Sequence, residues 1–215
     1  MEEFTLAFRP NKQLCRFSGN NKRMLSRNNI KSIKAREILD SRGNPTVEVE
    51  LITEGGAFKS GVPSGASTGK YEAVELRDKN NRYNGKGVLG AIKNIKEVIG
   101  PKLLGLDASN QEDIDKMMID MDGTEDKSRL GANALVGVSM VVCKAGAAGK
   151  STYLWRHIAE LAKNNLPPFL PKGAFNVING GAHASNDLDI QEFMLVSQKE
   201  SFSQNVQRAC EIYHE

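Results

Sequence analysis

The pattern of apolar and charged positions first becomes regular where the two alternate with a period of two. The segment 46–51 reads Thr-Val-Glu-Val-Glu-Leu, which is typical of a strand buried on one face. An Asp-Ser-Arg-Gly-Asn-Pro turn at 40–45 separates it from a similar segment at 33–38, and a Glu-Gly-Gly turn at 54–56 leads to a short strand near Phe58. The pattern predicts a three-stranded antiparallel meander.

Helical spacing replaces this alternation further along the chain. Four apolar residues recur at the spacing of one helix face: Val88, Ile92, Ile95 and Ile99. A second helix is expected to begin at the capping-box pair Ser109 and Glu112 and to stop at Gly123. It carries an apolar stripe of four residues: Ile114, Met117, Met118 and Met121. We interpret this stripe as a core face rather than a partner groove, because methionine readily fills irregular interiors.

The stretch 130–148 is apolar nearly all round and rich in glycine and alanine, which predicts the most buried helix of the chain. Its uncharged run from Leu130 to Cys143 has 14 residues. A bilayer span needs roughly 18 to 20. We therefore expect no transmembrane helix.

A proline-rich break indicates a domain boundary. After an amphipathic helix around Trp155–Leu161, the segment Leu-Pro-Pro-Phe-Leu-Pro at 166–171 interrupts helical structure. We expect one domain over 30–166 and a second over 167–215. The second opens with a strand-like segment at 175–178, and a loop, another strand-like segment at 189–196 and a helix follow.

Composition adds limits on function. The chain has 215 residues, 40% of them hydrophobic and 26% charged, which suits a soluble globular protein. Its formal charge of +3 is too small to indicate nucleic-acid binding. Three widely spaced cysteines form no C-x-x-C pair, so neither a disulfide framework nor a zinc site is predicted, and a reducing, intracellular compartment fits best.

Residues 1–29 differ from the rest of the chain. Six Lys/Arg outnumber two Glu there, and no steady periodicity is visible. We interpret them as a disordered basic extension. Organelle targeting is the alternative interpretation, but Glu2 and Glu3 are unlike the acid-poor composition of a transit peptide.

Two phosphate-binding patterns are incomplete. The segment 85–90 satisfies G-x-G-x-x-G, but polar residues rather than a strand precede it. The segment 65–70 ends like a P-loop, but it is one residue short, and Tyr71 stands where Ser or Thr is required. We interpret neither as a nucleotide site.

The loop 62–69, Val-Pro-Ser-Gly-Ala-Ser-Thr-Gly, is the first candidate site. Small residues permit unusual backbone angles and let a ligand approach the backbone. Composition alone favours a flexible linker, and a lid that folds over substrate is the functional alternative.

The second candidate site is a cluster of five polar residues in a loop and the strand after it: His183, Asp187, Asp189, Gln191 and Glu192. Cation binding and acid/base chemistry are both conceivable, although turn capping by the aspartates and a surface position for the histidine are the simpler interpretations. In a regular strand Glu192 would lie among apolar neighbours, which would raise its pKa. Gln191 and Glu192 would face opposite ways, so they can share a pocket only where the strand ends or bulges.

Several of these segments together resemble one family over residues 33–215. The matching words are the turn and strand at 40–49, the loop 62–69, Asp-Gly-Thr at 122–124, Leu-Gly-Ala-Asn-Ala at 130–134, Asn-Val-Ile-Asn-Gly-Gly at 176–181 and Gln-Glu-Phe-Met at 191–194. The chain resembles the amino-terminal half of a eukaryotic-like enolase, a phosphopyruvate hydratase.

The resemblance implies both a fold and an activity. The fold is an α+β N-terminal domain, a three-stranded antiparallel meander followed by helices, plus the first elements of an incomplete β/α (TIM-like) barrel. The activity is the reversible dehydration of 2-phospho-D-glycerate to phosphoenolpyruvate, a carbon–oxygen lyase reaction of glycolysis that uses two Mg²⁺ ions in a cytoplasmic homodimer.

The resemblance also implies roles for five residues. Ser67 matches the lid serine that ligates the second Mg²⁺, and Ala66 closes over substrate with it. His183 and Gln191 match substrate-binding residues, and Glu192 matches a residue that contacts substrate and assists at its hydroxyl end. Only 49 residues follow residue 166, whereas a complete barrel takes about 250, so we expect the carboxylate ligands of the first Mg²⁺ and the lysine base to be absent.

Two hypotheses follow from the resemblance. In the first, the chain is a fragment of an active enolase and is inactive alone. In the second, it is a short non-catalytic paralogue that acts as a binding module or as a partner of full-length enolase. Its open barrel edge would then expose Phe175, Ile178 and Phe193.

Overall fold

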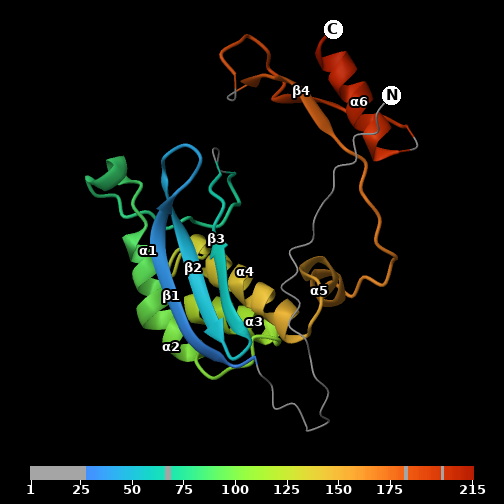
Figure 1. Ribbon diagram of the computed structural model, residues 1–215. Coiled ribbons are helices and arrows are strands. Elements are labelled where there is room, and N and C mark those ends of the chain that lie inside the picture. Colours follow the sequence, from blue (N-terminus) through green and yellow to red (C-terminus); the bar gives the residue numbers. More distant parts are fainter. Residues whose placement is uncertain (1–27, 66–68, 182–183, 200) are drawn as a thin grey trace. The chain divides into compact units, whose positions relative to one another are not determined.

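The structure is a computed structural model that describes residues 28–65, 69–181, 184–199 and 201–215 (Figure 1). The chain divides into two compact units, of which the first ends at Asn164 and the second comprises Asn165–Glu215. The division lies just before the proline-rich segment 166–171.

A three-stranded sheet forms one layer of the first unit. Its strands are antiparallel and adjacent in chain order: β1 (Ile30–Leu39), β2 (Pro45–Thr53) and β3 (Gly56–Gly61). In the central strand Val47, Val49 and Leu51 are fully buried, as the period-two alternation predicts. The predicted meander is confirmed.

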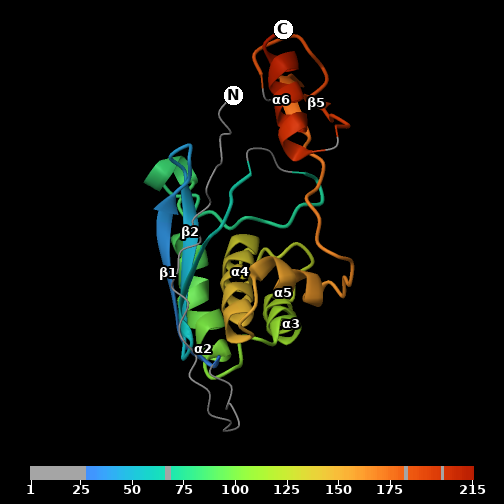
Figure 2. The same ribbon diagram turned by 45° about the vertical axis from the view of Figure 1, so that its right-hand side comes forward.

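Helices cover one face of this sheet (Figure 2). A continuous helical run is made of α1 (Leu89–Asn94), the π-helical η2 (Ile95–Ile99) and α2 (Gly100–Leu103). Three further helices follow: α3 (Gln111–Asp122), α4 (Ala132–Gly149) and α5 (Leu154–Leu161). α4 packs on β2 and β3 and carries α3 on its other side. A single 3-10 turn, η1 (Arg82–Gly85), precedes them.

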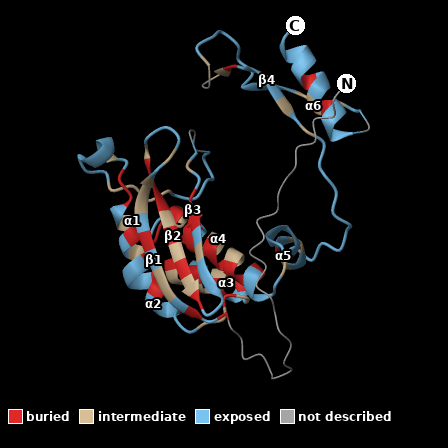
Figure 3. Ribbon diagram, viewed as in Figure 1, coloured by how far each residue is buried: buried red, intermediate tan, exposed pale blue. Residues whose placement is uncertain are grey.

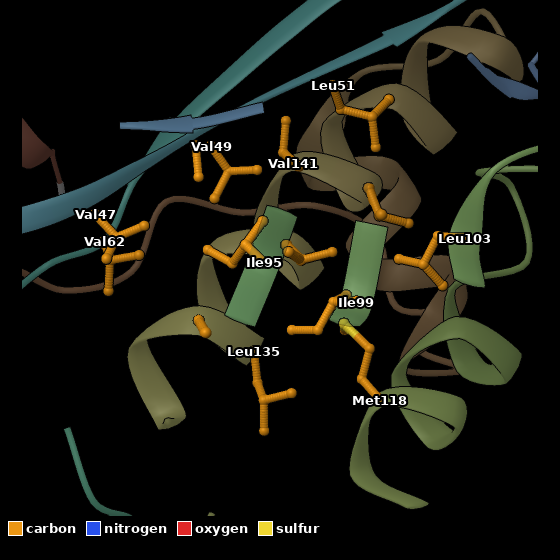
Figure 4. Close-up of a cluster of buried hydrophobic side chains, with 14 of the residues drawn as sticks. Val47, Val49, Leu51, Val62, Ile95, Ile99, Leu103, Met118, Leu135 and Val141 are labelled. Atoms are coloured by element: carbon orange, nitrogen blue, oxygen red, sulfur yellow. The ribbon is translucent and has the colours of Figure 1, made fainter. Parts of the chain in front are cut away.

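The core lies between the sheet and these helices (Figure 4). Val49 of β2, Ile95 of η2 and Val141 of α4 belong to this cluster, and Val47 lies beside Val62 at its edge in this view. The methionine stripe of α3 belongs to this core, because Met118 is buried and Met117 and Met121 pack against it. Its interpretation as a core face is confirmed.

α4 is the helix that the sequence predicts to be most buried. It is also the one helix in the described part of the chain that is long and apolar enough to cross a membrane, on length and composition alone. Ten of its residues are buried, and its position between the sheet and α3 accounts for this composition.

The predicted capping box of α3 is wrong. The helix begins at Gln111 behind Asn110, which makes no side-chain capping bond. The hydroxyl of Ser109 instead accepts a hydrogen bond of 2.9 Å from Nδ2 of Asn28. Gly123 ends the helix as predicted, with a left-handed φ of 67° that glycine adopts readily.

Asn28 and Asn29 belong to the folded unit, which corrects the extent of the expected extension. Asn28 is buried, and Asn29 forms an antiparallel bridge with Asp107. The expected disorder of residues 1–27 lies outside the described residues.

The second unit contains an antiparallel pair of strands, β4 (Phe175–Asn179) and β5 (Glu192–Leu195), and the helix α6 (Phe202–Tyr213). The strand expected over 189–196 is therefore shorter. α6 begins at a capping box between Ser201 and Gln204 that the sequence analysis missed. The described residues of this unit form a two-stranded sheet and no closed barrel.

Candidate functional site

The loop 62–69 leaves the sheet from a fixed stem. The main chain of Val62 continues the pairing with β2, since its N–H donates to the carbonyl of Val47 at 2.8 Å. The hydroxyl of Thr46 donates to the carbonyl of Val62 at 2.7 Å. Val62 itself is buried. The stem is thus part of the core layer, and the loop begins only after it.

Two arginines hold Ser64, two residues further along the loop. Nη2 of Arg42 donates to the Ser64 carbonyl at 2.8 Å, and Nη2 of Arg77 donates to its hydroxyl at 3.1 Å. Nη1 of Arg77 also donates to the carbonyls of Pro45 and Lys86, each at 2.6 Å, and Arg77 pairs with Glu75. A planar guanidinium makes several such bonds at once, which ties Ser64 to the turn between β1 and β2.

That turn is itself rigidly bonded. One carboxylate oxygen of Asp40 accepts hydrogen bonds of 2.8 Å from the N–H groups of Asn44 and Arg42. These bonds, the one from Asn44 first, hold the pKa of Asp40 below its usual 3.8. Asp40 therefore stays ionised at neutral pH and keeps the turn that carries Arg42 in place.

The far end of the loop is held more lightly. The N–H of Gly69 donates to the carboxylate of Glu72 at 2.9 Å, and the N–H of Val74 donates to the carbonyl of Asp126 at 2.7 Å. Ala66 and Ser67, the predicted site residues of the loop, lie outside the described residues. The described stem contradicts the linker interpretation for Val62 and Ser64, because both are tied to the folded unit.

In the second unit a glycine turn positions the other predicted residues. The N–H of Gly180 donates to the carbonyl of Gln191 at 2.8 Å, and that of Gly181 donates to the carbonyl of Leu188 at 2.7 Å. A Cβ on Gly180 would lie 2.4 Å from the carbonyl oxygen of Ile190, so only glycine fits there. This close approach brings the turn against the start of β5.

Gln191 and Glu192 occupy the point where β5 begins. Gln191 lies in the bend before the strand, and Glu192 is its first residue, opposite Asn179 of β4. The strand boundary therefore falls between them, which is one of the two conditions under which both side chains can serve one pocket. His183, the third predicted residue of this site, lies outside the described residues.

The expected apolar surroundings of Glu192 are not found. Glu192 is exposed, as are Ile190, Met194 and Val196, because β4 and β5 form a sheet of only two strands. The turn between β4 and β5 is also held by Asn186. Its Oδ1 accepts a hydrogen bond from the N–H of Leu188 at 3.2 Å, and its Nδ2 donates to the carbonyl of Asn179 at 3.0 Å.

The chemistry that this arrangement offers is hydrogen bonding to a polar ligand. Gln191 offers an amide and Glu192 a carboxylate to solvent beside a hydrogen-bonded turn. Within the ranges that the structure describes, no group of three or more His, Cys, Asp or Glu side chains is placed so that it could hold a metal ion.

Comparison with known proteins gives the family. A model described as the enolase N-terminal domain matches residues 30–158, which is more than half of the chain. The chain belongs to the enolase family. A model described as the enolase C-terminal TIM barrel domain matches residues 168–215, so this second match begins within the proline-rich segment.

A curated enolase from Mastigamoeba balamuthi is 57% identical to the chain over 187 residues. The match covers 86% of the chain and 42% of that enolase, so the chain spans less than half the length of this relative. The resemblance to enolase stated from the sequence is confirmed, and so is the fold class that it implied.

Two residues that hold the stem of the loop 62–69 were not predicted from the sequence. Arg42 lies inside the turn motif, so the motif could have indicated it. Arg77 lies in a segment without regular pattern, and nothing in its neighbourhood points to a role. Its contacts join Pro45, Ser64 and Lys86, which are far from it in sequence, so only the tertiary structure identifies it.

Proposed function

We propose that this chain provides the lid and the substrate-contact edge of an enolase that converts 2-phospho-D-glycerate reversibly to phosphoenolpyruvate. Family membership supports the reaction, and the placement of Gln191 and Glu192 on either side of a strand boundary carries the assignment to this chain. A cytoplasmic enzyme that works as a homodimer is part of the same proposal.

We assign roles to five residues. Glu192 contacts substrate near the departing hydroxyl and assists its loss as water, and Gln191 donates or accepts a hydrogen bond at the same end. His183 and Ala66 contact substrate. Ser67 would ligate one of two Mg²⁺ ions, which when bound supply charge that stabilises the developing anion.

The clamped stem of the loop supports the lid. Val62 and Ser64 are tied to the sheet and to the Asp40 turn, so a lid formed by this loop would have a fixed anchor at this end. A lid with a fixed anchor would close over the same place each time, which favours substrate capture over a linker role.

The test is hydratase activity of the protein that contains this chain. We expect Glu192→Gln to lower kcat by about 100-fold or more, as loss of an acid/base group does. Glu54→Gln, a matched change in the exposed turn between β2 and β3, should leave kcat unchanged. Full activity in the Glu192→Gln variant would contradict the assigned role.

The 215-residue polypeptide by itself should show no magnesium-dependent turnover. Its match to the barrel model covers only residues 168–215, whereas a complete barrel takes about 250 residues. Measurable conversion of 2-phosphoglycerate by the purified polypeptide would overturn this expectation.

A non-catalytic binding module is the second candidate, and an exposed apolar edge favours it. Ile178 and Phe193 are 50% and 38% exposed, and Met194 beside them is 53% exposed, while Phe175 is half-buried. Reading the transcript through Glu215 separates the candidates. An open frame that continues through a barrel supports the enzyme, and a stop codon there together with co-sedimentation of the chain with full-length enolase supports the module.

A further inference from the structure

An apolar groove of about 240 Å³ runs between α3 and α4 on the side away from the sheet. Ile119 of α3 and Val136 of α4 line it and are 48% and 43% exposed. Met118 and Leu135, both labelled in Figure 4, also line it and connect it to the core. Two large apolar side chains left open beside each other are costly in water, so the groove is suited to an apolar occupant.

One end of the groove has polar groups that lack partners. Nε2 of Gln111 donates to Oδ2 of Asp115 at 2.9 Å and to the hydroxyl of Ser139 at 3.0 Å, and both acceptors line the groove. Oε1 of Gln111 and Oδ1 of Asp115 are buried, and neither has a hydrogen-bond partner among the described residues. Gln111 is 6% exposed.

Rotating the side-chain amide of Gln111 by half a turn does not give these buried oxygens a donor. Turning Gln111 over would place its oxygen against the Asp115 carboxylate and leave two acceptors facing each other. Two buried acceptors at one place require a donor, because an unsatisfied buried polar group costs about 1–3 kcal/mol. A guanidinium supplies several donors and a positive charge together.

The surrounding charge also favours a cation. α3 carries five Asp or Glu residues and only one Lys. Three of the acids, Glu112, Asp113 and Asp120, form no ion pair within the described part of the chain. The occupant that fits is therefore a basic segment with large apolar side chains next to an arginine.

Residues 1–27 have this composition. They contain six Lys/Arg and two Glu, and at Leu14, Arg16 and Phe17 an arginine stands between large apolar residues. The groove itself is lined by apolar residues and Asp115, so the two are complementary in charge and in apolar character.

The point of attachment brings this segment to the correct end of α3. The carbonyl of Asn28 accepts from the N–H of Ala108 at 3.1 Å, and its side chain bonds Ser109, two residues before Gln111. At 1.5 Å per helical residue, Asp115 and Ile119 lie only about 6 to 12 Å along the helix from Gln111. A tethered segment acts at high effective concentration, so modest contacts suffice to hold it.

We propose that residues 1–27 bind back onto the α3–α4 groove, with Arg16 donating to Gln111 and Asp115 while Leu14 and Phe17 cover Ile119 and Val136. The segment is then an intramolecular ligand of the N-terminal domain. This function is separate from the substrate site.

Cys143 provides the readout. It is half-buried on α4, one turn after Met140, and burial followed by the charge of Asp115 raises the pKa of its thiol. In full chains that carry Cys15→Ser and Cys210→Ser, the thiolate labelling rate of Cys143 reports whether the groove is covered. We expect Arg16→Glu to raise this rate about fivefold, which corresponds to loss of about 1 kcal/mol of coupling.

Matched variants separate docking from general effects. Lys12→Glu makes the same charge change between polar neighbours and should alter the rate less than about twofold. Asp115→Lys combined with Arg16→Glu should restore protection, because the swapped pair can form again. Equal labelling in Arg16→Glu and the parent, or no rescue by the swap, would overturn the proposal. Protection that disappears on dilution would also overturn it, because a second copy would then be the occupant.

Discussion

The two units of this chain differ in how they bury apolar surface (Figure 3). In the unit that ends at Asn164, residues from the sheet, five helical segments and the loops beside them form one cluster of 22 buried apolar side chains. In the unit Asn165–Glu215, Ala209 is the only buried apolar residue among those described. The first unit thus has a core of its own, and the second has almost none.

The difference shows which of the two candidate sites is the more firmly anchored. The stem of the loop 62–69 is anchored to the sheet and to arginines of the first unit. Gln191 and Glu192 are held only by the glycine turn and a two-stranded sheet that exposes Ile178 and Phe193. A sheet of two strands is marginally stable in water, so this edge requires further apolar cover to become rigid.

A core truncation provides the strongest test of this contrast. Leu51→Ala should lower the free energy of unfolding by about 2–5 kcal/mol, because Leu51 is fully buried between the sheet and the helices. The matched Phe193→Ala in the second unit should cost less than about 1 kcal/mol. Urea unfolding followed by fluorescence of Trp155 and by circular dichroism measures both. Equal costs would mean that the second unit has a core of similar strength.

A buried carboxylate in the first unit should give the next largest effect. Asp122 accepts hydrogen bonds from the N–H of Leu130 at 2.7 Å and of Thr124 at 3.0 Å. Burial opposes its ionisation, but these bonds, the Thr124 hydroxyl included, outweigh it and lower its pKa below 3.8. Asp122→Ala should destabilise the chain by about 2–3 kcal/mol.

The exposed Asp189 is the control for Asp122. Asp189→Ala should change the free energy of unfolding by less than about 0.5 kcal/mol. Thermal unfolding of both variants at one pH measures the two changes in stability. If Asp122→Ala costs no more than Asp189→Ala, the loop after α3 is held by other contacts.

A smaller effect concerns pH and His157. This residue is fully buried on α5, and both ring nitrogens lack partners among the described residues. Burial, and next Lys150, lower its pKa below 6.5, while Glu160 acts in the opposite direction. The unfolded chain therefore binds the proton more readily, and the stability of the first unit is lost as pH falls below 6.5.

Replacing His157 should remove this pH dependence. We expect His157→Leu to lose less stability than the parent chain between pH 7 and 5.5, as measured by urea unfolding at each pH. Carboxylates with a lowered pKa, such as Glu37 beside Arg82, change stability only below about pH 4.5. They therefore do not affect the comparison between pH 7 and 5.5. If the free energy of unfolding falls equally with pH in His157→Leu and in the parent chain, His157 does not cause the pH dependence.

The smallest effect is expected at the exposed edge. Ile178→Ser should change the free energy of unfolding by less than about 0.5 kcal/mol, since Ile178 is half exposed on β4. It should nevertheless reduce self-association, because an exposed strand edge with apolar side chains promotes aggregation. Light scattering at increasing concentration measures this, with Lys199→Ser as a control in the same unit.

The sequence predicted the first unit better than the second. Alternation in β2 and the stripe of α3 identify buried faces correctly, because those faces repeat with the period of the backbone. The same reasoning placed Glu192 among apolar groups, and the structure instead leaves Glu192 and those apolar residues exposed. The capping box of α3 was wrong because the helix begins behind Asn110, one residue after Ser109.

The sequence by itself determined the meander, the buried α4 helix, the stop at Gly123 and membership of the enolase family. These depend on periodicity and on motifs whose residues are close in the chain. Only the tertiary structure decided that Arg77 hydrogen-bonds Ser64 and that Asn28 hydrogen-bonds Ser109 before α3. It also decided that a strand boundary separates Gln191 from Glu192. Each of these depends on contacts or pairing between segments that no local pattern encodes.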